Sequence, residues 1–270
     1  MLSREPAGPL RPFVSRVWTV DQRGAPPIAA IERVLPTGDT HLAIRLTGEP
    51  LWIVGETGAG TIMGPAVVGG ARSGAYLKDV SEPSWSIGAQ LRPGAARLLF
   101  GATDGDLAGR HTDLALLWGT AAGELRERAA EAATPDARLA VLEAALAARL
   151  PRVREVHPAV AAALDHFRQS SDVRAAVAAG GIAHRRFIGL FREQVGLGPK
   201  VFCRVRRFQR AVRFVARRPD RSWADIAAAC GYSDQPHLHR DFVAFAGVTP
   251  GEYRALAPAW PNHVPLAPRR

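Results

Sequence analysis

The chain has 270 residues, 47% of them hydrophobic, and a formal net charge of +10 that lies almost wholly in its C-terminal part. Residues 152–254 carry 18 Lys and Arg against 9 Asp and Glu, whereas residues 1–151 carry 15 against 16. The hydrophobic fraction excludes a disordered chain. No apolar run is long enough to span a membrane, so a cytoplasmic protein is expected. The distribution of charge predicts that a neutral N-terminal part is joined to a module that binds polyanions.

Residues 1–92 are predicted to form an antiparallel β domain. Residues 1–12 are expected to be a loose arm. Strands are then predicted at 13–20, 31–35, 41–46, 51–55, 61–68, 75–80 and 84–91, with turn residues between them. Short strands at such regular spacing favour a barrel or a sandwich.

The predicted strands carry aromatic and polar side chains that suit a pocket for a small ligand, which is usually apolar with a few polar groups. The candidates are Trp18, His41, Arg45, Trp52, Tyr76, Trp85 and Gln90. The alternative is that most of these aromatic side chains belong to the ordinary core. His41 and His111 lie far apart in the sequence, and no metal-binding, phosphate-loop or nucleophile-elbow spacing occurs. We therefore expect no catalytic residue, no metal and no cofactor.

Residues 93–150 are expected to be helical, with a short helix at 93–101 and longer ones at 113–133 and 136–150. In the last of these, leucines recur at three- and four-residue spacing, at Leu139, Leu142, Leu146 and Leu150. This stripe either packs on the β domain or pairs with its copy in a homodimer. Charges and flanking prolines mark residues 152–157 as a linker.

Residues 158–257 predict an all-α domain with an internal repeat, and residues 258–270 a tail. Each repeat unit is helix, turn and helix, with Gly181 and Gly231 as equivalent turn glycines. The second helix of the first unit begins after Ala183, which offers no capping side chain. The two cysteines, Cys203 and Cys230, lie on predicted helix faces without a metal-ligand partner at short spacing, so they are expected to be packing residues.

A long helix at 199–216 is predicted to join the two units. Its apolar face is formed by Val201, Val205, Phe208, Val212 and Val215, and a basic stripe by Arg206, Arg210 and Arg213. A rigid spacer of this kind can hold two recognition helices in successive major grooves. The basic stripe is either a phosphate contact or a solvated face.

The second unit, WADIAAACGYSDQPHLHRDFVAFAGVTPGEYR at 223–254, resembles the second helix-turn-helix and closing signature of AraC/XylS-type transcription regulators. The matching residues are Ile226, Ala227, Cys230, Gly231, Tyr232, Asp234, Leu238, Arg240, Phe242, Gly247, Thr249, Pro250, Tyr253 and Arg254.

The resemblance implies an α+β protein that binds double-stranded DNA and regulates transcription. Residues 1–151 would form a cupin-like antiparallel β-barrel with trailing helices, for sensing or dimerisation, and residues 158–257 the DNA-binding domain. The expected DNA-binding residues are Arg185, Arg186, Ile188, Gly189, Arg192, Gln235, Pro236, His239 and Arg240. A small-molecule effector, a homodimer and a contact with RNA polymerase are compatible with it. The competing hypothesis is an enzyme, a barrel that modifies a small molecule and is fused to a basic helical domain.

Overall fold

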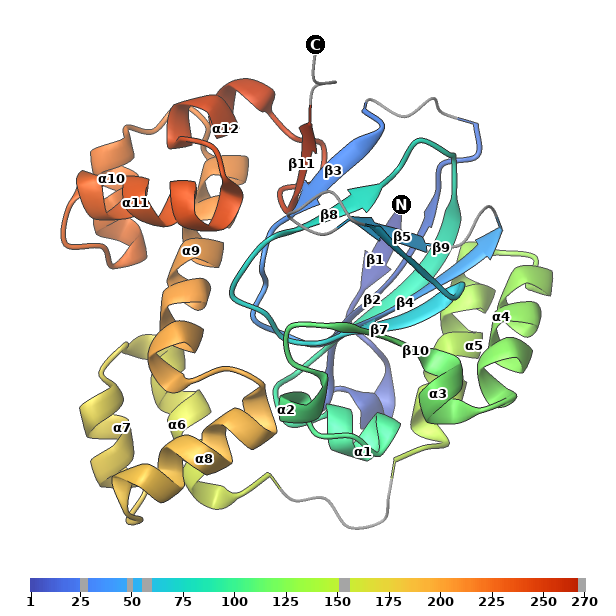
Figure 1. Cartoon of the computed structure of the whole chain (residues 1–270), viewed down its shortest axis with the longest axis horizontal. Helices are drawn as coiled ribbons and strands as arrows, with labels where there is room; N and C mark the ends of the chain where they lie inside the picture. Colours follow the sequence, from blue (N-terminus) through green and yellow to red (C-terminus); the bar gives the residue numbers. More distant parts are fainter. Residues whose placement is uncertain (25–28, 48–50, 55–59, 151–155, 267–270) are drawn as a thin grey trace.

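The computed structural model describes residues 1–24, 29–47, 51–54, 60–150 and 156–266. An N-terminal domain contains two β-sheets, with helices α3 to α5 on its far side, and the helical domain stands beside it (Figure 1). The predicted α+β class is therefore confirmed. None of the described helices is long and apolar enough to cross a membrane.

Both sheets are antiparallel throughout. The larger sheet has the order β1 (Leu2–Arg4), β2 (Val14–Asp21), β9 (Trp85–Leu91), β4 (His41–Thr47), β7 (Ala66–Gly69) and β10 (His111–Asp113). The smaller sheet has the order β11 (His263–Leu266), β3 (Ile31–Val34), β8 (Tyr76–Asp79), β5 (Leu51–Val54) and β6 (Gly60–Met63).

These sheets correct the expectation of one closed barrel, since no ladder joins them within the described strands. The single strand predicted at 61–68 is in fact β6 and β7, which belong to different sheets. The break falls at Gly64–Pro65, where proline cannot donate to a ladder. Two further expectations were wrong at the edges of the domain. The loose arm contains β1, which pairs with β2, and the tail contains β11, which pairs with β3.

One face of the larger sheet is covered by helices. These are α3 (Leu114–Trp118), α4 (Ala121–Glu131) and α5 (Pro135–Ala147), preceded by α1 (Ala96–Phe100) and α2 (Asp104–Leu107). The helix predicted at 113–133 is divided at Gly119 into α3 and α4. Leu139, Leu142 and Leu146 are fully buried in the core under the sheet. The leucine stripe thus packs on the β domain, which decides between its two predicted roles.

The helical domain has two cores, one for each repeat unit. It consists of α6 (Pro158–Gln169), α7 (Val173–Ala179), α8 (His184–Val195), α9 (Pro199–Arg217), α10 (Trp223–Cys230), α11 (Gln235–Ala246) and α12 (Pro250–Leu256). Cys203 is buried in the first core and Cys230 in the second, as expected of packing residues. Most of the predicted linker lies outside the described residues.

Candidate functional site

The turn between α10 and α11 is built from local signals in the sequence. The Ser222 hydroxyl caps α10, and Gly231 ends it with a φ of +81°. Asp234 then caps α11 by accepting a 2.7 Å hydrogen bond from the backbone N–H of His237. That bond is the main reason why the pKa of Asp234 lies below its usual range. The start of α11 is therefore fixed by its own sequence.

Helix α11 has a buried face and an exposed face, as predicted. Leu238, Phe242 and Phe245 pack in the core of the second unit. The four candidate DNA-binding residues are exposed on the other side, Gln235, Pro236, His239 and Arg240. A short helix presented in this way suits the major groove.

Asp241 holds α11 against α9. Its buried carboxylate lies 2.6 Å from the Nε of Arg204 and 3.7 Å from an Nη of Arg207. Both positive charges on α9 are thus directed at Asp241, while the neighbouring Arg240 is exposed to solvent. The sequence analysis overlooked this network, although an aspartate in the middle of a helix next to buried phenylalanines is itself a signal for a buried ion pair.

The first unit shows the same plan with a weaker helix start. Ala183 makes no capping hydrogen bond, and Gly181 adopts a φ of +63° like its equivalent in the second unit. Arg185, Arg186 and Gly189 of α8 are exposed, whereas Ile188 packs partly against the core of its own unit. Arg192 lies at the other end of α8, toward the N-terminal domain.

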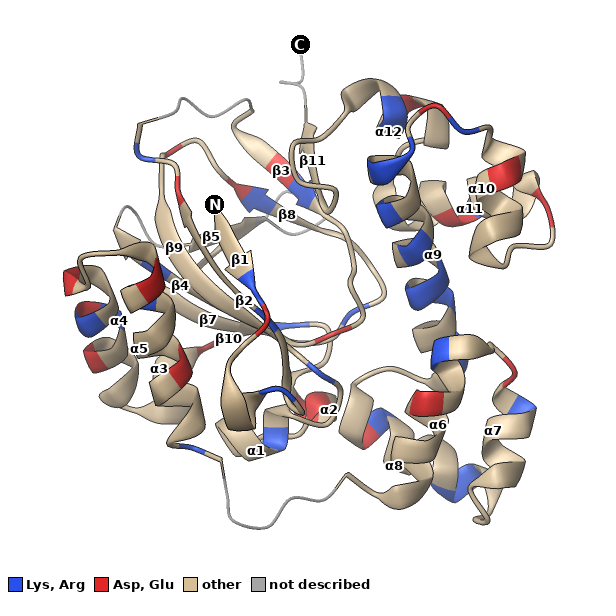
Figure 2. Ribbon diagram, turned by 180° about the vertical axis from the view of Figure 1, so that it is seen from behind, with Lys and Arg blue, Asp and Glu red and all other residues tan. Residues whose placement is uncertain are grey.

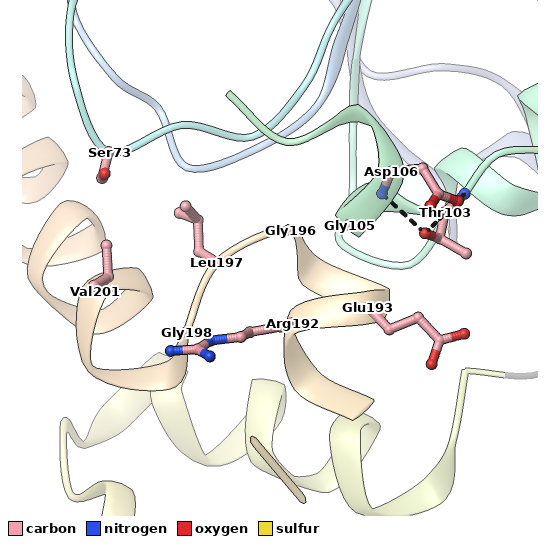
Figure 3. A pocket seen from close by; sticks show the side chains of 10 residues that line it. All are labelled: Ser73, Thr103, Gly105, Asp106, Arg192, Glu193, Gly196, Leu197, Gly198 and Val201. Atoms are coloured by element: carbon pink, nitrogen blue, oxygen red, sulfur yellow. Dashed lines mark hydrogen bonds between the residues drawn. The ribbon is translucent and has the colours of Figure 1, made fainter. Parts of the chain in front are cut away.

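A shallow pocket of about 500 Å³ lies between the two domains at this end of α8 (Figure 3). It is lined by Ser73, Thr103, Gly105, Asp106, Arg192, Glu193, Gly196, Leu197, Gly198 and Val201. The side chain of Arg192 reaches toward Gly198 in this pocket. Val201 is 39% exposed here, and its predicted place on the buried face of α9 is wrong.

The basic residues along α9 are visible as a blue stripe in Figure 2. Arg206 in this stripe faces the N-terminal domain, where its Nη1 lies 3.4 Å from the Oδ2 of Asp39. Burial raises the pKa of Asp39, and the positive charge of Arg206 opposes that rise. At this position the stripe is therefore a contact between domains.

A second candidate site lies between the two sheets of the N-terminal domain. Its centre is His111 of β10, whose ring meets those of His41 and Tyr76 at centroid distances of 6.0 and 4.6 Å. His41 and His111 are thus neighbours despite their separation in the sequence, which corrects the argument that they were too far apart to share a site. The guanidinium of Arg72 lies 4.5 Å from the ring centroid of Tyr76.

This inter-sheet cluster of His41, Arg72, Tyr76 and His111 is rich in hydrogen-bond donors. An Nη of Arg72 lies 3.2 Å from the Nδ1 of His111. Because a guanidinium can only donate, Nδ1 must accept and the proton of the neutral ring lies on Nε2. Burial and the charge of Arg72 lower the pKa of His111 to about 2 and that of His41 to about 4, so both rings are neutral. The Nε2 of His111 and the Nε of Arg72 have no hydrogen-bond partner.

The smaller sheet adds further ionisable groups beside this cluster. His263 of β11 lies 2.9 Å from a carboxylate oxygen of Glu32 on β3, and Lys78 of β8 is paired in register with Glu32. Both His263 and Lys78 are close enough to His41 to lower its pKa. Within the described part of the chain, no three His, Cys, Asp or Glu side chains are placed to hold a metal ion.

The other candidate ligand residues are dispersed. Trp85 points to the helix-covered face and lies in the core there, with Arg138 stacked on it at 4.1 Å. Trp52 is 46% exposed on the outer hairpin, and Trp18 packs over Gly88. Gln90 donates to Asp39 at 3.2 Å.

Arg45 is buried on β4, the strand that begins with His41. From the predicted set, the structure brings together His41 and Tyr76, whose rings both lie beside that of His111. It adds Arg72 and His111, which the sequence analysis did not select.

Comparison with known proteins divides the chain in the same way. Residues 177–256 match the family model "Helix-turn-helix domain", and residues 3–113 match "Domain of unknown function (DUF6597)". The HTH-type transcriptional regulator MtrA of Neisseria gonorrhoeae is 31% identical over 78 residues, which are 29% of this chain. The chain spans about a quarter (26%) of the length of that relative.

A solved structure extends the likeness over both domains. ToxT of Vibrio cholerae O395 superposes with a TM-score of 0.50 and 9% sequence identity. The match covers 90% of this chain and 97% of that one, so the two proteins share a fold.

Proposed function

We propose that the chain is a sequence-specific DNA-binding transcription regulator of the AraC/XylS type, controlled by a small molecule, because residues 177–256 match the model of a helix-turn-helix domain. Residues 158–257 would be its DNA-binding domain and residues 1–151 its sensing domain. Homodimer formation and contact with RNA polymerase stay predictions from the family resemblance.

The observation that carries the proposal is the exposed face of α11. Gln235, His239 and Arg240 project from a helix whose opposite face is fixed by Phe242 and by the Asp241 ion pairs. Arginine pairs with guanine and glutamine with adenine through two hydrogen bonds each, so these side chains suit the reading of bases. Because the backbone of α11 is already held in place, the conformational freedom lost when DNA binds is mainly that of these exposed side chains.

Selection of genomic DNA fragments by the purified full-length chain tests this function. We expect a shared sequence with two half-sites, bound at least about a thousandfold more tightly than random DNA at the same salt concentration. Equal affinity for selected and random fragments would show a nonspecific DNA-binding protein instead.

We further propose that the inter-sheet cluster is the effector site and that the effector carries an oxyanion such as a carboxylate. The cluster offers the Nε–H groups of Arg72 and His111 without acceptors, and buried cations favour an anionic partner. The space between two sheets is also the position in which a cupin-like domain would hold a ligand.

Thermal melting with a set of small carboxylates and their neutral amides tests this site. A carboxylate that binds should raise the melting temperature of the wild type and leave Arg72→Gln unchanged. Arg16→Gln, which changes an exposed arginine of β2, is the control. Equal stabilisation of Arg72→Gln by that carboxylate would place its binding site elsewhere.

A further inference from the structure

The second helix-turn-helix unit shares its core with the N-terminal domain. Leu35, which follows β3, is 1% exposed and belongs to the same buried cluster as Phe208 of α9 and Phe242 of α11. Val264 of β11 is fully buried in that cluster as well. The second unit is therefore packed on the N-terminal domain over an apolar contact, which resists displacement more than a polar surface contact does.

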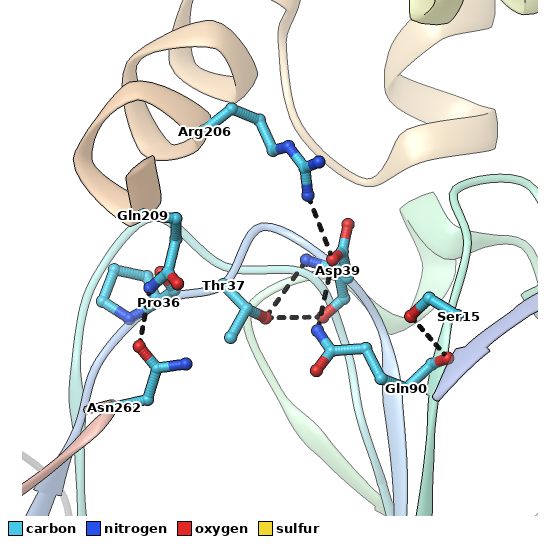
Figure 4. Close-up of polar contacts among 8 residues, drawn as sticks. All are labelled: Ser15, Pro36, Thr37, Asp39, Gln90, Arg206, Gln209 and Asn262. Carbon is cyan, nitrogen blue, oxygen red and sulfur yellow. Dashed lines mark hydrogen bonds and ion pairs between the residues drawn. The ribbon is translucent and has the colours of Figure 1, made fainter. Parts of the chain in front are cut away.

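Polar contacts fix the orientation of this unit. The side-chain amide of Gln209 on α9 donates to the carbonyl of Pro36 and to the Oδ1 of Asn262, each at 2.9 Å (Figure 4). Arg33 of β3 donates to the carbonyl of Ala246 at the end of α11. The residues that make these directional bonds on the N-terminal domain lie in β3, just after β3 and just before β11.

The first unit rests on a different part of the N-terminal domain. Ala71 is 1% exposed and belongs to the core of that unit, together with Phe191 of α8 and Phe202 of α9. A Cβ atom at Gly196 would lie 2.8 Å from the carbonyl oxygen of Asp104, which shows how closely the end of α8 approaches α2. Arg97 and Glu193 form an exposed ion pair across the same contact at 3.6 Å.

Asp39 connects the two regions of contact. Its carboxylate pairs with Arg206 in the first half of α9 and accepts a 3.2 Å hydrogen bond from the side-chain amide of Gln90 (Figure 4). The N-terminal domain thus contacts α9 between the two units and touches each unit separately.

From these contacts we infer that the N-terminal domain sets the distance and rotation between recognition helices α8 and α11, so that Arg33 and Asp39 are positioning residues for the half-site spacing that the chain reads. This inference rests on the proposed DNA-binding function. Moving one half-site by a base pair shifts its groove by about 3.4 Å and rotates it by about 35°. If α9 alone joined the two helix-turn-helix units, it could bend to follow this shift. Because both units also pack on the N-terminal domain, they can follow the shift only if contacts with that domain break.

The test is a double variant, Arg33→Gln with Asp39→Asn, in the full-length chain. It removes the charge from two interdomain contacts, keeps both cores and leaves the net charge unchanged. The matched control is Arg16→Gln with Glu82→Gln, two exposed residues of the N-terminal domain. Affinity is measured for the selected DNA sequence and for versions with one or two base pairs added or removed between its half-sites.

For the wild type and the control we expect affinity to fall steeply on either side of the natural spacing. In the double variant the preference for the natural spacing over its neighbours should fall by about threefold or more. An unchanged spacing profile in a folded double variant, or tighter binding at every spacing alike, would overturn the inference. If the double variant does not fold, the same measurement of affinity against half-site spacing is made on Arg33→Gln alone, and its result decides. If the proposed function itself is wrong, the wild-type protein will bind no selected sequence, and this result is distinct from an unchanged spacing profile.

Discussion

The guanidinium of Arg33 lies 2.9 Å from the carbonyl oxygen of Ala246, although 213 residues separate the two in the chain. Ala246 is the last residue of α11, where helix carbonyls lack partners within the helix and a positive charge is favourable. A carbonyl at the end of α11 is thus satisfied by a strand of the other domain.

Removal of β11 should destabilise the protein. Truncation after Ala257 deletes Val264, which is fully buried, together with the Glu32–His263 ion pair and the bond from Gln209 to Asn262. We expect the free energy of unfolding to fall by at least about 2 kcal/mol in a urea titration. Truncation after Leu266 keeps the strand and serves as the control. Equal stability of the two truncated chains would mean that β11 adds nothing to the fold.

Arg240→Ala should weaken specific DNA binding without lowering stability. The side chain is exposed, and the adjacent Asp241 is engaged with Arg204, so the loss is that of a base or phosphate contact worth about 1–3 kcal/mol. Titration of the selected DNA measures this loss, and Arg128→Ala on α4 controls for the change in net charge. A lowered melting temperature with unchanged affinity would instead assign Arg240 a structural role.

Phe242→Ala should have the opposite effect. The Phe242 ring is fully buried, with centroids 5.2 Å from Phe208 and 5.5 Å from Tyr253, so its truncation should cost about 3–5 kcal/mol. The next residue, Val243, is 46% exposed, and Val243→Ala should cost much less. Chemical denaturation compares the two, and similar losses would mean that the faces of α11 are assigned wrongly.

Asp104 should make stability depend on pH. Burial raises the pKa of its carboxyl from 3.8 to about 6, against the hydrogen bond from Thr40. The folded state therefore binds the proton more tightly than the unfolded state. The stabilising effect of protonation is complete below the unfolded pKa and is lost as pH rises through about 6.

Measurement of unfolding free energy against pH, for the wild type and for Asp104→Asn, isolates this group. The wild type should lose about 2.5 kcal/mol relative to the variant between about pH 4 and 7, since a shift of about two pK units is worth about 1.36 kcal/mol per unit and a small part of the change lies below pH 4. A constant difference between the two proteins would show that Asp104 does not titrate in this range.

The second helix-turn-helix unit could be predicted from sequence because its signals are local. Asp234 caps the helix that follows it, and the spacing of Leu238 and Phe242 specifies the buried face. The neighbourhood of His41 and His111 could not be predicted in this way, because it depends on which strands pair with β7. The sequence of a short strand does not indicate which strand it pairs with. For the same reason β11 was not predicted within the expected tail.

Trp85 shows a second kind of limit. Its alternation with Ile87, Ala89 and Leu91 places all four on one face of β9, as they are. Alternation separates the faces of a strand without telling which face meets the other sheet. The sequence therefore left Trp85 to either a ligand pocket or the ordinary core, and it lies in the core under the helices.

The pairing of β11 with β3 also has a consequence for biosynthesis. Residues 263–266 leave the ribosome about 230 residues after their partner at 31–34, and after both repeat units have emerged. Until then one edge of the smaller sheet lacks its neighbour, and Leu35 lacks the core that buries it. The nascent N-terminal domain therefore exposes an open strand edge and an apolar residue during most of translation, and such surfaces bind chaperones or aggregate.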